Sequence, residues 1–393
     1  MVIKDVKIDQ LQWKSVLGWR VLHKDIEANN SQLVLVFGSR MILTQKGEEL
    51  LNDLRSMYPK AIIAGCSTAG EIHNENINDD SLVATAVYFE KCHIESASIS
   101  GQMLCGNDYR SGSKLAKSIK HCDLAHVMVL ANGSAVNGSE LIRGIYHNLP
   151  KNIAVTGGLA GDGDRFDTTI VFLDSIKKKS IATIIGFYGK DLAVGFGSQG
   201  GWDSFGPKRV ITRAEGNLLY ELDGQPALDI YEKYLGDYSH GLPATGLLFP
   251  INVELTNCNS SVVRTLLAID SNTRSVTFAG DVPEGANCQL MKGNLNRLVD
   301  GSMDAAFQSV RKIQSSEERI EPQLAILISC VGRKMLLKQR TVEELKVVRN
   351  VVGEECTLAG FYSYGEIAPH NNMLTPILHN QTMTITTLSE NNG

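Results

Sequence analysis

Residues 64–72 read Ala-Gly-Cys-Ser-Thr-Ala-Gly-Glu-Ile, and residues 359–367 read Ala-Gly-Phe-Tyr-Ser-Tyr-Gly-Glu-Ile. The same nine-residue frame therefore occurs once near each end of the chain. The preceding segments repeat as well, because Gly38-Ser39-Arg40-Met41 follows one apolar run and Gly332-Arg333-Lys334-Met335 follows another. Each copy reads as a strand, a helix, a second strand and a Gly-Glu-Ile turn. Self-similarity of this kind is typical of internal duplication, so we predict two related halves.

Short apolar runs alternate with helical patterns along the chain. Residues 33–37 and 61–64 are continuous apolar runs, as in buried strands, and residues 46–57 between them have helical periodicity. Several neighbouring strands are joined by turns too short for a crossover helix, which favours mixed sheets over purely parallel ones. We therefore predict an α/β fold with mixed sheets, in which the two halves pack around a shared cleft.

A change in sequence character near residue 220 marks the predicted boundary between the halves. Asp223-Gly224 reads as a turn, and Pro226 suits the first position of the helix that follows. We predict an N-terminal extension at 1–29, an N-terminal domain at 30–223 and a C-terminal domain at 224–388.

Composition excludes several classes of partner. The chain has 393 residues and a net charge of -5, which gives no general attraction to nucleic acid or anionic lipid. It contains no apolar run of about 18 residues, as a membrane-spanning helix requires, and residues 1–10 lack a signal-peptide core. The eight cysteines form no Cys-x-x-Cys pair, as expected of reduced thiols. We expect a cytoplasmic protein that binds neither nucleic acid nor membrane.

Several motifs together resemble the FIST domain, a sensory domain of bacterial signal transduction. The first is the Gly-Glu-Ile frame at 65–72, and the second is Gly-Gly-Leu-Ala-Gly-Asp-Gly at 157–163. The others follow in family order at residues 215–236, 280–286, 330–333, 360–367 and 379–382. The resemblance extends from about residue 30 to residue 388.

This resemblance implies a ligand-sensing module that informs a histidine kinase, a chemoreceptor or a cyclic-dinucleotide enzyme. No kinase, methyl-accepting or cyclase segment is present in the sequence, so the expected partner is a separate protein. Stand-alone FIST proteins of this size are similar to the haem-containing nitric-oxide sensors called NosP. On that similarity we expect haem b, nitric oxide as the ligand and control of a histidine kinase or another two-component protein; a homodimer is left open.

The repeated frames supply the predicted ligand site. Their glycines suit backbone conformations that other residues adopt poorly, so a purely structural role is the alternative for them. Between the glycines, one copy has small hydroxyls and a thiol where the other has aromatic rings. These groups would line one pocket between the halves, where ligand sites often lie. The predicted ligand-binding residues are Cys66, Ser67, Thr68, Gly70, Glu71, Gly158, Arg333, Tyr362, Tyr364 and Glu366.

Haem would need an axial ligand, which is most often histidine. Without a Cys-x-x-Cys-His motif, any haem would be bound non-covalently. His240 is the first candidate, because aromatic and aliphatic residues surround it in sequence, although a loop histidine that caps backbone groups is the alternative. His370 and His379 follow, and for His379 a structural hydrogen-bonding role is the alternative.

Two further hypotheses compete with haem sensing. One is a receptor without haem for a small polar metabolite such as an amino acid, with Ser67, Thr68 and Arg333 as polar contacts. The other is a thiol-dependent enzyme with Cys66 as nucleophile, which would need a base in reach that the sequence does not identify. Residues 195–200 match Gly-x-Gly-x-x-Gly, but no helix follows to bind a phosphate, so we reject a dinucleotide site. We predict a binding protein and not an enzyme.

Overall fold

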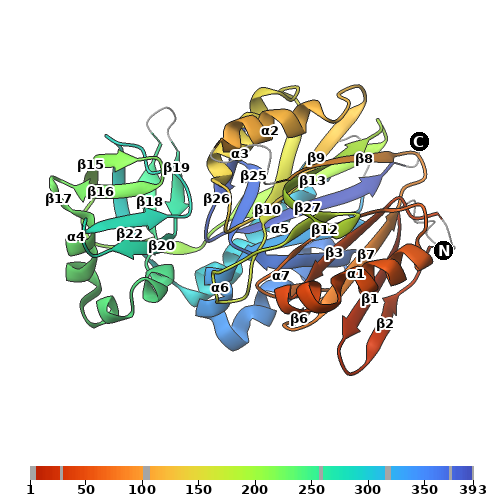
Figure 1. Cartoon of the computed structure of the whole chain (residues 1–393), viewed down its shortest axis with the longest axis horizontal. Helices are drawn as coiled ribbons and strands as arrows, with labels where there is room; N and C mark the ends of the chain where they lie inside the picture. The colour runs from red at the N-terminus through yellow and green to blue at the C-terminus, as the bar shows by residue number, and fades with distance from the viewer. Residues whose placement is uncertain are drawn as a thin grey trace.

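The computed structural model describes residues 6–26, 30–100, 107–255, 260–314, 320–370 and 374–391, without the side chain of Lys179. Figure 1 shows a large body and a smaller lobe beside it, the lobe drawn in green to teal. The described strands form sheets of twelve, six and nine strands, and the nine-stranded sheet belongs to the lobe. In the described part of the chain, no helix is both long enough and apolar enough to cross a membrane.

The body consists of three units with one strand plan. In each unit, two parallel strands joined by a helical segment lie side by side. An antiparallel strand pairs with the first of them, and a fourth strand pairs with that antiparallel strand. Unit 1 has the order β1-β7-β3-β4. Its elements are β1 (Lys7–Lys14), β3 (Leu33–Gly38), α1 (Arg40–Met57), β4 (Ile62–Ser67) and β7 (Leu82–Tyr88).

Units 2 and 3 repeat this order as β8-β12-β9-β10 and β13-β27-β23-β24. Unit 2 contains β8 (His93–Ser100), α2 (Asp108–Lys117), β9 (Leu124–Ala131), α3 (Gly138–His147), β10 (Ala154–Leu159) and β12 (Ser175–Tyr188). Unit 3 contains β13 (Leu192–Gln199), α5 (Leu295–Ile313), β23 (Leu324–Cys330), α6 (Val331–Leu337), η3 (Lys338–Arg340), α7 (Thr341–Val352), β24 (Thr357–Ser363) and β27 (Met383–Glu390).

In each unit, the segment after the second parallel strand forms a strand that pairs with a strand of another unit. The segment after β4 pairs with β24, the segment after β10 pairs with β4, and the segment after β24 pairs with β10. The three exchanges close a cycle, so the turns that follow the second parallel strands are held between units. The exchanged strands and their extensions are β5 (Glu71–His73), β6 (Asn76–Asn78), β11 (Val171–Leu173), β25 (Gly365–Pro369) and β26 (Pro376–His379). At the other end of the twelve-stranded sheet, β2 (Gly18–His23) pairs with β1.

One glycine recurs where the two parallel strands of each unit lie closest. A Cβ at Gly65, Gly157 or Gly360 would collide with the carbonyl oxygen of the residue opposite on the neighbouring strand. The opposing residues are Val36, Val129 and Leu327. Because the same close approach occurs in all three units, these glycines are required by strand packing.

The lobe is an insertion between β13 and α5 of unit 3. It has its own core, which includes Leu228, Tyr231 and Phe278. Its elements are β14 (Trp202–Ser204), β15 (Arg209–Glu215), β16 (Leu218–Leu222), β17 (Gln225–Pro226), α4 (Ala227–Leu235), η1 (Gly236–Gly241), η2 (Ala244–Leu248), β18 (Ile251–Glu254), β19 (Ser261–Arg264), β20 (Leu266–Asp270), β21 (Ser275–Phe278) and β22 (Asn287–Gly293).

The predicted mixed α/β class is confirmed. Both copies of the repeated frame have the predicted order of strand, helical segment, strand and turn, with parallel first and second strands. The structure adds unit 2 as a third copy. The turn at Asp223-Gly224, where we placed the domain boundary, joins β16 to β17 inside the lobe, and both of its residues have positive φ.

Candidate functional site

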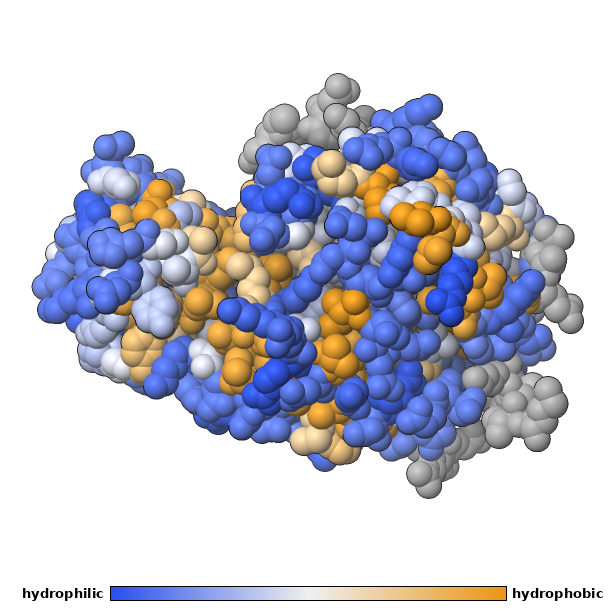
Figure 2. All heavy atoms as spheres, turned by 90° about the horizontal axis from the view of Figure 1, so that it is seen from below, coloured by the Kyte–Doolittle hydropathy of each residue, from blue (hydrophilic) through white to orange (hydrophobic). Residues whose placement is uncertain are grey.

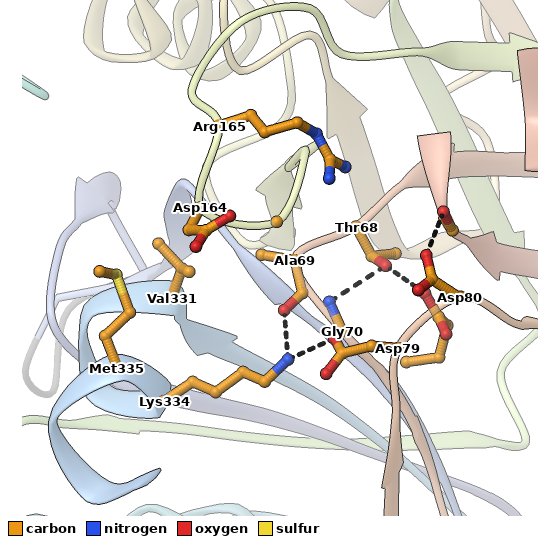
Figure 3. A pocket seen from close by; sticks show the side chains of 13 residues that line it. Thr68, Ala69, Gly70, Asp79, Asp80, Asp164, Arg165, Val331, Lys334 and Met335 are labelled. Atoms are coloured by element: carbon orange, nitrogen blue, oxygen red, sulfur yellow. Dashed lines mark hydrogen bonds and ion pairs between the residues drawn. The ribbon is translucent and has the colours of Figure 1, made fainter. Parts of the chain in front are cut away.

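A cavity of about 340 Å³ lies where segments of all three units meet (Figure 3). The turn after β4 contributes Thr68 to Glu71, and the segment after β10 contributes Gly163 to Arg165. Unit 3 contributes one side of α6, which is the helix that follows its first parallel strand. The lining residues are Ser39, Thr68, Ala69, Gly70, Glu71, Asp79, Asp80, Gly163, Asp164, Arg165, Val331, Lys334 and Met335.

Glu71 is the buried carboxyl group of this cavity. Its side chain accepts hydrogen bonds from the hydroxyls of Thr68 at 2.7 Å and Ser81 at 2.6 Å. Burial raises the pKa of Glu71 to about 8, against the smaller lowering effect of these two hydrogen bonds. The group is therefore mostly protonated at neutral pH. A change in nearby charge would shift this equilibrium.

Lys334 reaches across the cavity from α6 to the turn of unit 1. Its ammonium donates to the carbonyl oxygen of Ala69 at 2.9 Å and to Asp79 at 2.5 Å. It also lies 5.6 Å from the centre of the Tyr362 ring. Figure 3 shows this side chain below the cavity, with Arg165 on the opposite side. Lys334 thus connects two units at the site.

Unit 2 has an acid at the position that corresponds to Glu71, and its surroundings differ. Asp162 is fully buried and accepts from Arg165, whose Nε lies 2.9 Å from its Oδ1. The Nε of Arg40 lies 3.0 Å from the same oxygen. Arg40 and Lys334 are equivalent residues, because each stands two positions after the glycine of the repeated Gly-x-x-Met segment. Two arginines of the chain therefore occupy the site around Asp162.

Glu366 is the corresponding acid of unit 3. It accepts from the hydroxyl of Ser363 at 2.7 Å and from the backbone N–H and hydroxyl of Thr382 at 3.1 and 3.0 Å. Burial raises its pKa to about 8, as for Glu71. Glu366 does not line the cavity beside Glu71. Glu71 and Glu366 thus both accept from hydroxyls, with Ser81 at Glu71 where Thr382 stands at Glu366, whereas Asp162 is paired with two arginines.

The structure brings only part of the predicted ligand-binding set to the cavity. Thr68, Gly70 and Glu71 line it. The other predicted residues are buried in strands or in the core and do not line it: Cys66, Ser67, Gly158, Arg333, Tyr362, Tyr364 and Glu366. Burial raises the pKa of the Cys66 thiol, which removes the thiolate that a nucleophile requires.

Arg333, Tyr362 and Tyr364 do not line the cavity but hold segments beside it in place. Arg333 donates to Glu344 at 2.5 Å, and neither side chain is exposed to solvent. Tyr362 donates to the other oxygen of Glu344 at 3.1 Å. Tyr364 accepts from the backbone N–H of Phe166 at 3.0 Å and stacks on its ring, which fixes the loop that carries Arg165.

Most of the charged lining residues were not predicted from the sequence, namely Asp79, Asp80, Asp164, Arg165 and Lys334. The available signal was the repeated Gly-x-x-Met segment. Its third residue is Arg40 in one copy and Lys334 in the other. Each pairs with an acid of another unit, Arg40 with Asp162 and Lys334 with Asp79.

The three candidate haem ligands lie apart from this cavity. His240 is exposed on η1 of the lobe. The Nε2 of His379 lies 3.3 Å from the carbonyl oxygen of Ala368, and burial lowers the pKa of His379 to about 3. His370 is buried, and its Nε2 has no hydrogen-bond partner among the described residues. No cluster of three or more His, Cys, Asp or Glu residues suited to a metal ion occurs in the described ranges.

His370 and His379 line a second cavity of about 860 Å³ between the body and the lobe. The body contributes Phe196 of β13 and the α5 residues Phe307, Arg311 and Lys312, and the lobe contributes residues 261–263 of β19. Figure 2 shows apolar atoms where the lobe joins the body. The second cavity is larger than the first and combines aromatic rings, cationic side chains and imidazoles.

Comparison with known proteins gives matches along most of the chain. The model of the FIST N domain matches residues 32–225, and the model of the FIST C domain matches residues 227–369. An uncharacterized protein of Methanocaldococcus jannaschii, MJ1623, is 23% identical in an alignment 386 residues long. The match covers 86% of this chain and 72% of that protein.

Two solved structures align over 98% of this chain and 99% of their own, each at 8% sequence identity. They are a chorismatase, with a TM-score of 0.34, and a cyanuric acid hydrolase from A. caulinodans, with a TM-score of 0.41. At these scores, neither similarity bears on the activity of this chain.

Proposed function

The chain belongs to the FIST family, whose sensory domains are associated with signal transduction, and on that premise we propose that it senses a small polar ligand. The ligand, such as an amino acid, would bind in the cavity beside Glu71. The output would act on a separate protein, a histidine kinase or another two-component or cyclic-dinucleotide signalling protein.

The observation that carries this proposal is the convergence of the repeated segments on one cavity. The Gly-Glu-Ile turn of unit 1, the glycine-rich segment of unit 2 and the Gly-x-x-Met segment of unit 3 all contribute lining residues. The lining includes four carboxyl groups, Arg165 and Lys334. A few convergent polar groups of both signs suit a small zwitterion better than an apolar molecule.

The position of the cavity also supports a signalling role. A ligand in contact with Thr68, Asp164 and Lys334 at once would bridge segments of three units. Binding would favour whichever arrangement of the units best fits the ligand, up to the difference in affinity between arrangements. A partner protein that contacts more than one unit would then distinguish the bound and free states.

We propose binding and not catalysis for this site. Cys66, the candidate nucleophile, is fully buried in β4 and does not line the cavity. Three of the four lining carboxyl groups, those of Glu71, Asp79 and Asp80, accept hydrogen bonds from Thr68, Ser81, Lys334 and Ser39.

Thermal unfolding in the presence of single amino acids and amines tests the proposal. A ligand present at 100 times its Kd should stabilise the wild type by about 2.7 kcal/mol. Lys334→Ala should lose most of that shift, whereas Lys338→Ala, which changes an exposed lysine at the end of the same helix, should keep it. A shift of full size in Lys334→Ala, or no shift with any compound in the wild type, would contradict the proposal.

The second cavity supports one further candidate, haem-based sensing of nitric oxide. The specific observation is the buried Nε2 of His370, which lacks a hydrogen-bond partner among the described residues. Neutral imidazole is a common axial ligand, and burial favours the neutral form because it lowers the pKa of His370. Bound haem b would supply the iron that takes up nitric oxide. Arg311 and Lys312 would then lie near its propionates.

An absorption spectrum separates this candidate from the first. Protein purified from haem-supplemented cells should show a Soret band that shifts with nitric oxide, and His370→Ala should change the ferrous spectrum. His240→Ala is the control, because that histidine is exposed and does not line the second cavity. A colourless wild-type protein, or a spectrum altered by His240→Ala alone, would rule out haem at this cavity.

A further inference from the structure

The second cavity, between the body and the lobe, has an excess of positive charge among its lining residues. Its volume of about 860 Å³ is within the usual range for sites that enclose a small organic molecule. Arg311 and Lys312 of α5 line it, and Asp304 is the single acid among its described lining residues. The charge of this lining therefore favours an anion over a cation as the occupant.

A buried histidine of the same lining points to a ligand. His370 lines the cavity and is only 8% exposed, and its Nε2 has no hydrogen-bond partner among the described residues. His379, the other histidine of the lining, has the carbonyl oxygen of Ala368 at 3.3 Å from its Nε2. Buried polar atoms are almost always hydrogen-bonded, because an unpaired one has lost its bonds to water without replacement. An oxygen atom of a ligand would supply the partner that His370 lacks.

Aromatic rings and cations lie together on the wall that α5 and β13 form. Phe307 of α5 lines the cavity and is 52% exposed, although phenylalanine is one of the residues most often buried. Arg311 follows four positions later, is exposed, and forms no ion pair with another described residue. Residues four apart are neighbours on a helix surface, so Phe307 and Arg311 offer a ring and a guanidinium side by side. The ammonium of Lys312 lies 3.5 Å from the centre of the Phe196 ring.

We propose that the second cavity binds a small aromatic carboxylate. The ring of the ligand would pack against Phe307, and its carboxylate would pair with Arg311, whose fork of N–H groups matches two carboxylate oxygens. An imidazole nitrogen is a donor or an acceptor, so Nε2 of His370 would form a hydrogen bond to an oxygen of the ligand. This inference does not rest on the sensing of a polar ligand in the first cavity. For the second cavity it names an occupant without iron, in place of haem.

Titrations with benzoate, 4-hydroxyphenylacetate and indole-3-acetate, each compared with its uncharged amide, test the inference. The amide keeps the ring and the shape of the acid but has no negative charge. At least one of the acids should bind the wild-type protein. Its amide should bind at least about tenfold more weakly, because the hydrogen bonds of Arg311 to a charged group are lost. Ligand-observed NMR measures both affinities, including weak ones.

Two exposed residues of the lining give variants that leave the core intact. Arg311→Gln should weaken binding of the acid at least about tenfold and leave the affinity of the amide unchanged. Phe307→Ala should weaken the acid and the amide alike, by about two- to tenfold, because both lose the contact with the ring. Arg110→Gln is the control and should change neither, since Arg110 is an exposed arginine of α2 that does not line the cavity.

His370→Leu tests the buried imidazole with two measurements. It should weaken binding of the acid by about two- to tenfold, because one hydrogen bond is lost. In the free protein it should not lower the melting temperature, since an apolar side chain replaces a buried nitrogen that has no partner. A lower melting temperature together with unchanged affinity would show that His370 has a structural role and does not contact the ligand.

The remaining outcomes either support the inference or overturn it. If none of the acids binds at millimolar concentration, or if Arg311→Gln and Phe307→Ala both leave the affinity unchanged, the inference is wrong. If protoporphyrin IX binds in a way that depends on Arg311 but the small acids do not bind, the inference is wrong and the haem candidate gains support. If binding of the acids depends on Lys334 and not on Arg311, they occupy the first cavity, which also contradicts the inference. The tests with amino acids and amines at the first cavity are independent of all these results.

Discussion

Glu71 and Glu366 occupy the same position in two copies of one turn, and each accepts a 2.7 Å hydrogen bond from the hydroxyl three residues before it. Burial raises the pKa of both carboxyl groups to about 8. The repeated turn therefore places a protonated carboxylic acid between units at two points of the body. At one of these points the acid meets a cavity.

These two acids predict how stability depends on pH. In the native protein they keep their protons up to about pH 8, whereas in the unfolded chain they lose them near 4.5. The unfolded state then binds fewer protons, so the free energy of unfolding should fall as pH rises, by at most about 1.4 kcal/mol per pH unit for each acid. Below 6.5 the unfolded chain protonates histidines such as His126, which native burial keeps neutral, and this opposes the trend.

Urea unfolding between pH 7 and 8 measures this effect above the range in which most histidines of the unfolded chain titrate. Lys312, whose pKa burial lowers to about 8, contributes in the opposite direction. Glu366→Gln should flatten the decline by its own share, as should Glu71→Gln. If Glu71→Gln and Glu366→Gln both leave the wild-type slope unchanged in this window, neither acid is protonated in the native state.

The recurring glycines predict equivalent losses of stability in the three units. Gly65→Ala, Gly157→Ala and Gly360→Ala each place a methyl group against a backbone carbonyl oxygen. We expect each to destabilise the protein by about 1–3 kcal/mol or more, because backbone cannot move away as a side chain can. Gly200→Ala is the control, since its added Cβ would make only ordinary contacts of 3.6 and 3.8 Å. Equal melting temperatures for Gly200→Ala and the three variants would refute the packing role.

Substitutions of Arg333 and Lys334, two neighbouring residues of α6, should lower the free energy of unfolding by very different amounts. Arg333→Met removes one partner of a fully buried ion pair with Glu344 and should lower the free energy of unfolding by about 3–5 kcal/mol. Lys334→Met breaks a pair whose acid is largely exposed and should cost at most about 1 kcal/mol. Chemical denaturation checks both values. If Arg333→Met keeps wild-type stability but loses ligand binding, Arg333 contacts the ligand, as we expected from sequence.

Thiol labelling tests whether Cys66 is available for chemistry. Among the described cysteines, Cys122 is exposed, whereas Cys66, Cys92, Cys288, Cys330 and Cys356 are buried. Iodoacetamide should modify Cys122 first in the native protein, as located by mass spectrometry, and Cys66 only after unfolding, because its thiol is buried and protonated. Rapid labelling of Cys66 would revive the nucleophile hypothesis. Cys105 and Cys258 lie outside the described residues.

The repeated frames predicted much of the body but not all of it. Units 1 and 3 were recognised because both have the spacing Ala-Gly, four residues, then Gly-Glu-Ile. Unit 2 keeps its packing glycine, Gly157, but its acid is Asp162, which stands one residue closer to that glycine. The shorter acid is bound by arginines instead of hydroxyls, so the sequence around it differs. Because the distance from glycine to acid differs in unit 2, the third copy is not evident from the sequence, and the strand pairing of the structure reveals it.

Of the ligand-binding residues predicted from the sequence, three residues of the turn after β4 line the cavity, and the predicted residue of α6 does not. Thr68, Gly70 and Glu71 belong to the repeated turn and line the cavity. On α6, however, the sequence favoured Arg333, and the residue at the cavity is Lys334. Successive side chains of a helix point about 100° apart. Arg333 therefore points into the core, whereas Lys334, the next residue, faces the cavity. Arg165 and Asp164 come from a loop that carries no repeated signal, and only the folded chain places them here.

Hydrogen exchange measured by mass spectrometry, with and without the amino acid or amine that raises the melting temperature most, tests the central claim most directly. If the cavity beside Glu71 is the ligand site, exchange should slow together in three separate segments, residues 68–71, 163–166 and 331–335, one from each unit. Slower exchange confined to residues 196–200 and 307–312 would place the ligand in the second cavity and contradict the account.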